Sequence, residues 1–333
     1  MSDAPARLRR LITGYRVSQA LRTVAELGIA DLVAEAPRSA SALAAATGVD
    51  PDRLERVLRL LEAEGVLAET GGAWRLTELG EPLRTDAPQS MHWRAINDGQ
   101  PMNWRCWEAL PEAVRSGQTG CELAHGRALF GRLAEDPAAG AVFDRLMAEQ
   151  SAGWGKAVAD AYPLAGLRTV VDVGGGRGAL LAALLRANPE VEGVLFDQPH
   201  VVPDGEKAFA AAGLAERTLA AGGDFFAAVP PGGDLYLLKQ VLHDWDDERC
   251  RVILGNCREA MTAEARLLIV EVATGPDGAG AYANHLDVHM MVLTGGRERS
   301  VQQYTALLEA AGLQLTRTIP TACELLLIEA RPA

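Results

Sequence analysis

The feature that most constrains the fold of this chain is a cluster of glycines between an apolar strand pattern and a helix pattern. The stretch TVVDVGGGRG, residues 169–178, predicts a buried strand, and a helix is expected over residues 177–187. Glycines at such a turn let the backbone approach a ligand closely at a helix N-terminus. The spacing is DxGxGxG, unlike the GxGxxG of dinucleotide sites, and no Walker lysine follows. A ligand other than a nucleoside triphosphate is therefore expected at Asp172, Gly174, Gly175, Gly176 and Gly178.

After this loop, strand and helix patterns alternate to the end of the chain. Further strands are expected at residues 193–196, 234–238, 266–272, 313–319 and 323–330. Ser300 with Gln303 forms a capping-box signal for a late helix that ends at Gly312. This alternation predicts a Rossmann-like α/β domain with a doubly wound, mostly parallel sheet over residues 163–333.

The N-terminal part has a different pattern, which predicts a winged helix. An apolar helix is expected to end at Pro37, Ser39 should start a second helix, and Asp50 should cap a third. Two short strands around Gly71 and Gly72 form a hairpin signal. Helix, helix, helix and hairpin is the winged-helix order. We assign it to residues 1–95 and a helical linker to residues 96–162.

Charge and composition exclude several classes of function. The chain of 333 residues has 32 Lys and Arg against 44 Asp and Glu, a net charge of −12, which disfavours nucleic-acid binding. In the third helix of the predicted winged helix, acidic residues are interspersed with the arginines, so it lacks the positive stripe that phosphate binding requires. No apolar run approaches the roughly 20 residues that span a bilayer, so the chain is expected to be cytoplasmic and without a membrane partner. The five cysteines show no CxxC spacing, which disfavours a zinc site or a disulfide framework.

Acidic residues follow the ends of two successive strands in the α/β part. Asp197 and Gln198 end one strand, and a carboxylate there can accept hydrogen bonds from a ribose diol. Asp224 and Phe225 lie further on and offer a carboxylate for an exocyclic amine and an apolar face for a purine. Together with the glycine loop they predict a nucleoside-containing cofactor.

The stretch LKQVLHDWDD, residues 238–247, crowds a lysine, a histidine and three carboxylates after a buried strand. It is either a solvated loop before a helix or the site of a histidine base. Lys239 and His243 follow one strand end and Glu271 ends another, and ligands of open α/β sheets bind at that edge. Asp246 is better interpreted as a helix N-cap than as a metal ligand, so we expect no metal.

These motifs resemble the S-adenosylmethionine-dependent O-methyltransferases of the plant caffeate and bacterial polyketide type. The resemblance covers nearly the whole chain and rests on VVDVGGGRG, LFDQPHVV, GGDFF, LKQVLHDWDDERC, LLIVEV and GGRERS. It implies a class I methyltransferase with a winged-helix dimerisation domain, a homodimer, and S-adenosyl-L-methionine as the cofactor with S-adenosyl-L-homocysteine as its product. Gln198 stands where the family more often has an apolar residue, which leaves the cofactor assignment intact.

The resemblance also implies a role for each matching residue. Glycines 174–176 would hold the methionine part, Asp197 the ribose, and Asp224 with Phe225 the adenine, while Asp172 and Lys239 would also contact the cofactor. His243 would be the catalytic base that removes a phenolic proton, and the acids that orient it would be Glu271 and Glu298.

The substrate implied by the resemblance is a small, flat, hydroxylated aromatic compound of secondary metabolism, such as a phenolic or polyketide-like intermediate. The expected pocket residues are Phe143, Met147, Asp244, Asn284, Met290 and Met291, although Asn284 fits a surface loop equally well. Two alternatives remain. A relative of this kind can use the cofactor site for hydroxylation, decarboxylation or cyclisation, and a winged-helix DNA-binding regulator would need no catalysis.

Overall fold

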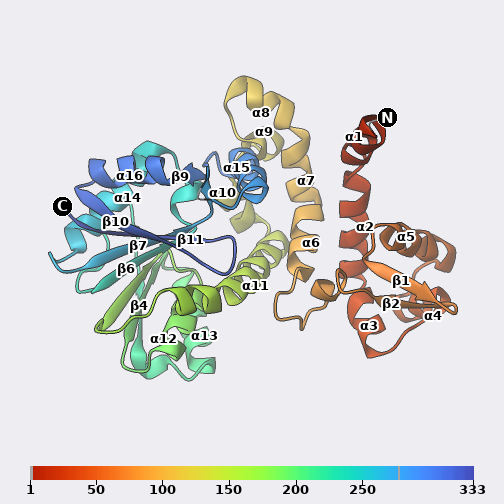
Figure 1. Cartoon of the computed structure of the whole chain (residues 1–333), viewed down its shortest axis with the longest axis horizontal. Helices are drawn as coiled ribbons and strands as arrows, with labels where there is room; N and C mark the ends of the chain where they lie inside the picture. The colour runs from red at the N-terminus through yellow and green to blue at the C-terminus, as the bar shows by residue number, and fades with distance from the viewer. Residues whose placement is uncertain (1–2, 277) are drawn as a thin grey trace. The chain divides into compact units, whose positions relative to one another are not determined.

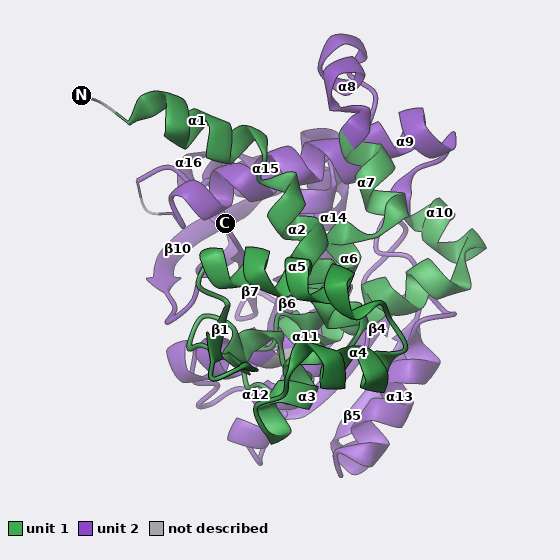
Figure 2. Cartoon of the chain, turned by 90° about the vertical axis from the view of Figure 1, so that its right-hand side faces the viewer, with its two compact units in different colours: residues 1–107, 130–150 green, residues 108–129, 151–333 purple. Residues whose placement is uncertain are grey.

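The computed structural model describes residues 3–276 and 278–333, which form two compact units (Figure 2). Unit 1 comprises residues 1–107 and 130–150, and unit 2 comprises residues 108–129 and 151–333. No helix among the described residues is long and apolar enough to cross a membrane. The predicted boundaries at residues 95 and 162 stay predictions.

Unit 1 is helical apart from one hairpin. Its elements are α1 (Ala4–Ile12), α2 (Tyr15–Glu26), α3 (Ile29–Glu35), α4 (Ala40–Thr47), α5 (Pro51–Ala63), β1 (Leu67–Thr70), β2 (Ala73–Leu76), η1 (Glu81–Leu83), α6 (His92–Gly99), α7 (Pro101–Glu108), α10 (Leu129–Glu135) and the first part of α11 (Pro137–Ala161). The hairpin is antiparallel and turns at Gly71 and Gly72, as predicted.

Local capping explains where the helices of unit 1 begin. The side chain of Ser39 accepts a hydrogen bond from the backbone N–H of Ala42, and that of Asp50 accepts one from Arg53. The prediction of a single helix running to Pro37 is wrong. Gly28 adopts a left-handed conformation with φ of 62°, and this turn separates α2 from α3.

Unit 2 is the α/β part. Its helices are α8 (Leu110–Ser116), α9 (Gly120–His125), the end of α11, α12 (Ala179–Ala187), α13 (Val202–Ala211), η2 (Ala215–Arg217), η3 (Leu242–Asp244), α14 (Asp247–Ala260), α15 (Ala281–Leu293) and α16 (Val301–Ala310). Its strands are β3 (Thr169–Val173), β4 (Glu192–Asp197), β5 (Thr218–Gly222), β6 (Leu235–Lys239), β7 (Arg266–Glu271), β8 (Ala273–Thr274), β9 (Arg299–Ser300), β10 (Leu313–Pro320) and β11 (Leu326–Pro332).

Seven strands form the central sheet in the order β10-β11-β7-β6-β3-β4-β5. Figure 1 shows this sheet with α14 and α16 on one side and α12 and α13 on the other. Strands β7, β6, β3, β4 and β5 are parallel, whereas β11 is antiparallel to both of its neighbours. The parallel strands therefore end at one edge of the sheet, and the glycine loop and the residues after β4, β6 and β7 all follow that edge.

Helices cover both faces of this sheet because its strands are apolar on both sides. Val170 packs into one cluster with α12 and α13, whereas its neighbour Val171 packs into a second cluster with α14 and α16. Successive side chains of a strand point to opposite faces, so a continuous apolar run is buried only when both faces are covered. The predicted doubly wound, mostly parallel sheet is confirmed.

Candidate active site

The glycine loop connects β3 to α12, and a Cβ would meet close neighbours at Gly174, Gly175 and Gly178 but not at Gly176. Gly174, Gly176 and Gly178 have φ of 71°, 58° and 72°, a region that favours glycine. A Cβ on Gly175 would lie 2.6 Å from the Asp172 carboxyl group and from Leu195. The loop therefore presents bare backbone at the helix N-terminus, which suits close approach of a ligand.

Asp172 and Lys239 lie under the loop at the ends of two adjacent strands. Asp172 is 2% exposed, and its burial raises the pKa of its carboxyl group to about 7 although the charge of Lys239 acts to lower it. Burial in turn lowers the pKa of Lys239. The Lys239 Nζ donates to Ser151 Oγ at 3.0 Å and lies 5.7 Å from the ring centre of Trp154. The sequence did not indicate Ser151, a small hydroxyl side chain within a long helix.

Asp197, at the end of β4, is held in position by two backbone groups. Its carboxylate accepts hydrogen bonds from the N–H of Gly176 at 2.8 Å and from the N–H of Gln198 at 2.6 Å. The Gln198 residue is exposed. The carboxylate is thus fixed beside the glycine loop, and two oxygens with four lone-pair positions leave it able to accept hydroxyl groups as well.

Asp224 and Phe225 follow β5 and lie next to the same loop. Asp224 is exposed and accepts a hydrogen bond from the N–H of Phe226 at 2.9 Å. The Phe225 ring would be 3.5 Å from a Cβ on Gly174, and the Phe225 carbonyl accepts a hydrogen bond from Asn256 at 2.8 Å. The bare loop after β3, the Asp197 carboxylate at the end of β4 and the Phe225 ring after β5 therefore lie at three neighbouring strand ends, and their role in cofactor binding stays a prediction.

His243 lies in η3 after β6 and is 6% exposed. Its Nδ1 is 2.7 Å from Glu298 Oε1 and 3.6 Å from Glu271 Oε2. An ionised carboxylate can only accept, so Nδ1–H donates to Glu298 and the neutral ring keeps its lone pair on Nε2. Asp244 Oδ1 lies 3.9 Å from Nε2, beyond hydrogen-bonding range.

Backbone pairing brings these distant residues together. Glu271 ends β7, and its Oε1 accepts hydrogen bonds from the N–H groups of Val241 and Leu242, just before His243. Two residues further on, β8 pairs in parallel with β9, which begins immediately after Glu298. Gln240, which precedes this loop, has φ of 51°, a strained conformation of the kind found at functional sites.

The charges around His243 oppose one another. Burial lowers the pKa of its imidazole, but the charge of Glu271, the Glu298 hydrogen bond and the charge of Asp244 raise it to about 10 overall. Burial raises the pKa of Glu271 to about 7 and that of Asp244 to about 6, although the His243 cation lowers both. In the absence of a ligand these charges therefore favour the imidazolium, protonated on both nitrogens, at neutral pH; the Nε2 lone pair is exposed only when the ring loses one proton.

The predicted substrate residues belong to both units. Phe143 and Met147 lie in the part of α11 that belongs to unit 1, and both are half-buried. Asn284, Met290 and Met291 all lie in α15, so Asn284 is on a helix and not in a loop. Asn284 is exposed, Met291 is half-buried, and Met290 is buried in a core cluster of unit 2. These pocket assignments stay predictions.

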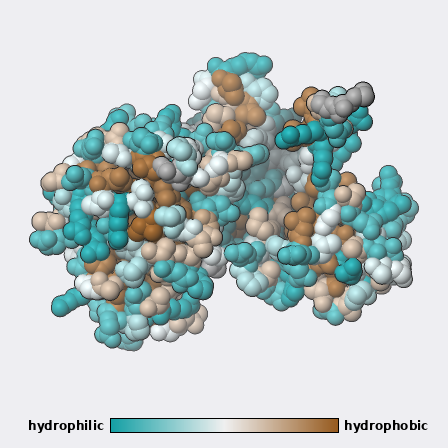
Figure 3. Space-filling model, viewed as in Figure 1, coloured by the Kyte–Doolittle hydropathy of each residue, from teal (hydrophilic) through white to brown (hydrophobic). Residues whose placement is uncertain are grey.

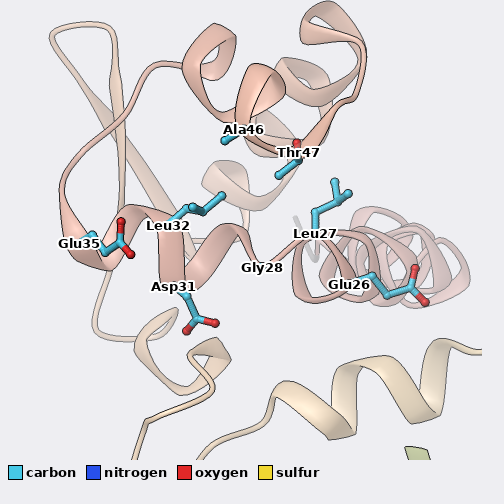
Figure 4. Close-up of a pocket in the computed structure, with 8 residues that line it drawn as sticks. All are labelled: Glu26, Leu27, Gly28, Asp31, Leu32, Glu35, Ala46 and Thr47. Atoms are coloured by element: carbon cyan, nitrogen blue, oxygen red, sulfur yellow. The ribbon is translucent and has the colours of Figure 1, made fainter.

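The His243 cluster also has the composition of a metal site: His243, Glu271 and Glu298 have ligand atoms within 4.8 Å of one another, the one such group among the described residues. A separate hollow on unit 1 (Figure 4) is lined by Glu26, Leu27, Gly28, Asp31, Leu32, Glu35, Ala46 and Thr47. Its carboxylates already have partners, in the pairs Arg22–Glu26, Arg38–Glu35 and Thr85–Asp31. Nothing there indicates a ligand.

This chain matches known methyltransferases along most of its length. A profile of the O-methyltransferase domain matches residues 107–314, and one of the O-methyltransferase dimerisation domain matches residues 9–86. The phenazine O-methyltransferase PhzM of Lysobacter antibioticus is 44% identical over 98% of this chain and 95% of its own length. The 8-amino-8-demethylriboflavin N,N-dimethyltransferase of Streptomyces davaonensis is 34% identical over 98% and 95%.

Among solved structures, CalO1, a methyltransferase of calicheamicin biosynthesis with SAH bound, superposes with a TM-score of 0.89. It is 32% identical, and the match covers 100% of both chains. The glycine loop and the carboxylates at the strand ends fit the methyl donor of such enzymes. This chain belongs to the O-methyltransferase family and is an S-adenosylmethionine-dependent methyltransferase.

Proposed function

We propose that this enzyme methylates a hydroxyl group of a small aromatic secondary metabolite, without a metal, and that His243 is the general base. The observation that carries the proposal is the 2.7 Å contact between His243 Nδ1 and Glu298. It orients the ring, and in the neutral form of the ring it leaves the Nε2 lone pair available for a proton. Glu271 is the second acid proposed to orient His243.

The residues at the strand ends are proposed to bind the cofactor. Glycines 174–176, with Asp172 and Lys239 beneath them, would hold the methionine part, and Asp197 and Gln198 would lie at the ribose. Asp224 and Phe225 would recognise the adenine. When bound, S-adenosyl-L-methionine supplies a methyl group on a cationic sulfur and leaves as S-adenosyl-L-homocysteine.

His243 is proposed to take the proton of the acceptor hydroxyl on Nε2. A phenol has a pKa of about 10 and is a poor nucleophile until it loses that proton. Base catalysis of this kind contributes about 100- to 10,000-fold. Asp244, whose carboxylate lies 3.9 Å from Nε2, is proposed to contact the acceptor on that side of the ring.

The presence of an oriented base favours oxygen over nitrogen as the acceptor atom. A neutral amine or ring nitrogen has a lone pair and needs no proton removed before it attacks, whereas a phenol does. The relative that acts on an aminoriboflavin shows that the family also includes N-methyltransferases. Hydroxylated phenazines are suitable test acceptors because the 44% identical relative is named for them.

In unit 2, Asn284, Met290 and Met291 of α15 are proposed to contact the acceptor. In unit 1, Phe143 and Met147 of α11 are proposed as acceptor-binding residues from the sequence resemblance. Apolar and sulfur-containing side chains suit a flat aromatic ring, and an amide suits a polar substituent. The three regions 1–95, 96–162 and 163–333 are proposed to serve dimerisation, pocket formation and cofactor binding.

The dimerisation domain supports a homodimer, and α1 offers an apolar face for it. Leu8, Leu11 and Ile12 are 58%, 71% and 67% exposed, and Figure 3 shows hydrophobic atoms beside the grey N-terminal residues. Exposed aliphatic groups clustered on one short helix mark an interaction surface. Leu11→Asp should reduce the mass measured by sedimentation towards that of a monomer, whereas Arg7→Asp, at an exposed polar position of the same helix, should not.

The function is tested with methyl-deuterated S-adenosylmethionine and a panel of phenols, hydroxylated phenazines and aromatic amines, with product masses as the readout. Labelled methyl on oxygen, lost in His243→Gln but kept in the exposed control His285→Gln, is expected. Label on nitrogen that persists in His243→Gln would reject the base role. A changed acceptor with an intact cofactor would instead indicate hydroxylation, decarboxylation or cyclisation.

A further inference from the structure

The segment that carries Glu298 is fastened to the loop that carries His243 by more than the bond between those two side chains. Arg297 N–H donates to the His243 carbonyl at 2.9 Å. A Cβ on Gly296 would lie 1.8 Å from the same carbonyl oxygen, so only glycine fits there. The two segments are therefore in backbone contact at the base itself.

Arg299, one residue after Glu298, makes most of the hydrogen bonds between the two segments. Arg299 is 0% exposed, which is rare for a residue that is always charged. Its Nη1 donates to the carbonyl of Leu242 at 2.9 Å, and its Nη2 donates to that of Trp245 at 2.8 Å. Its Nε and Nη2 also donate to Asp247 Oδ1, at 3.0 and 2.7 Å.

These acceptors lie on both sides of the proposed base. The carbonyls of Leu242 and Trp245 bracket His243 in the chain, and Asp247 begins the helix that follows. A planar guanidinium can bond all three groups at once because its donors point in fixed directions. A buried charge is tolerated only when its donors are satisfied in this way, so the loop and the arginine hold each other in place.

We propose that Arg299 is a positioning residue of the methyl-transfer site, which sets the backbone around His243 so that Nδ1 meets Glu298 and Nε2 stays free. This inference rests on the proposed role of His243 as the base. Lysine cannot replace Arg299, because one ammonium group cannot span two carbonyls and a carboxylate.

The state of the His243 ring is measured by ¹⁵N NMR of histidine-labelled protein bound to S-adenosyl-L-homocysteine, across a pH titration. The His243 signal is assigned with His243→Gln. The variants are Arg299→Met and Arg299→Lys, with Arg297→Met as the control because that side chain is exposed. Calorimetry with S-adenosyl-L-homocysteine reports whether the cofactor site is kept.

Wild type and Arg297→Met should show the neutral ring protonated on Nδ1. In Arg299→Met and Arg299→Lys the tautomers should mix, and the pKa of His243 should fall towards its ordinary value because the Glu298 contact loosens. If Arg299 acted only through its charge, Arg299→Met would instead raise the pKa of His243, because a nearby cation lowers the pKa of a histidine. Arg299→Lys, which keeps the positive charge, would leave that pKa unchanged. The affinity for S-adenosyl-L-homocysteine should stay within about twofold, a change of less than 0.5 kcal/mol.

Failure of the inference is distinct from failure of the proposed function. A neutral wild-type ring, observed above the pKa of His243, that carries its one proton on Nε2 would reject the base role itself, and the inference with it. The expected wild-type tautomer, unchanged in both Arg299 variants, would refute positioning alone. Should these variants unfold, Asp247→Asn removes only the charge of the half-exposed partner, and it should shift the tautomer in the same direction by a smaller amount.

Discussion

Replacing Glu298 by glutamine removes one negative charge from His243 and keeps the size of the side chain. The His243 ring and the Glu298 carboxylate are both buried, and 2.7 Å separates Nδ1 from Oε1. Glutamine can also present its amide N–H to Nδ1, which would place the ring proton on Nε2 and block the base. The change should therefore lower kcat.

The size of the effect follows from the contact. A hydrogen bond to a charged group contributes about 1.5–3 kcal/mol, and each 1.36 kcal/mol changes a rate about tenfold. Glu271 Oε2 remains 3.6 Å from Nδ1 and retains part of the orientation. We therefore expect kcat to fall about 10- to 100-fold, while the affinity for S-adenosyl-L-homocysteine changes less than about twofold.

The assay is steady-state methylation with the acceptor found by isotope labelling, together with calorimetric titration of S-adenosyl-L-homocysteine. Glu329→Gln is the matched control, because Glu329 is another buried carboxylate of unit 2 that accepts a hydrogen bond from Tyr162 at 2.5 Å. It should lower the melting temperature without lowering kcat in folded protein. A Glu298→Gln variant with kcat within about twofold of wild type, or one that loses activity only as far as Glu329→Gln does, would refute the orienting role.

Three further predictions concern pH, the glycine loop and metals. Activity should keep rising as the pH increases above 6.5, because only the neutral His243 ring can act as a base. Burial lowers the pKa of this ring, but Glu271 and the other carboxylates raise it to about 10 overall. A profile of kcat/KM whose acidic limb has a pKa at or below 6.5 contradicts this prediction. Gly175→Ala should weaken S-adenosyl-L-homocysteine binding about tenfold in calorimetry, because its Cβ would lie 2.6 Å from the carboxyl carbon of Asp172 and overpacking costs about 1–3 kcal/mol. The control Gly255→Ala, whose Cβ meets nothing within 4 Å, should bind S-adenosyl-L-homocysteine normally. A chelator should leave the methylation rate unchanged, because Nδ1 of the proposed base is already held by a carboxylate; a loss of rate that Zn²⁺ restores would indicate a cation in the cluster.

Much of the fold could be predicted because its signals are local. A short polar side chain before an apolar helix pattern satisfies the first backbone N–H groups, and Ser39, Asp50, Asp246 and Ser300 all cap helices as expected. Continuous apolar strands alternating with helices predict a parallel sheet covered on both faces. The wrong prediction, one helix across Gly28, arose because the apolar pattern continues through the break.

The sequence by itself determined the glycine loop and the strand ends, and hence the edge of the sheet where the ligand is proposed to bind, because sterics and strand direction act over a few residues. It also indicated His243, although the two acids proposed to orient it were assigned by resemblance. Only the tertiary structure decided which groups meet. Glu298 lies 55 positions from His243, and Lys239 lies 88 from Ser151, so no local pattern could pair them. The burial of Arg299 was equally hidden, since an arginine in a polar stretch is usually exposed and only the fold places three acceptors around it.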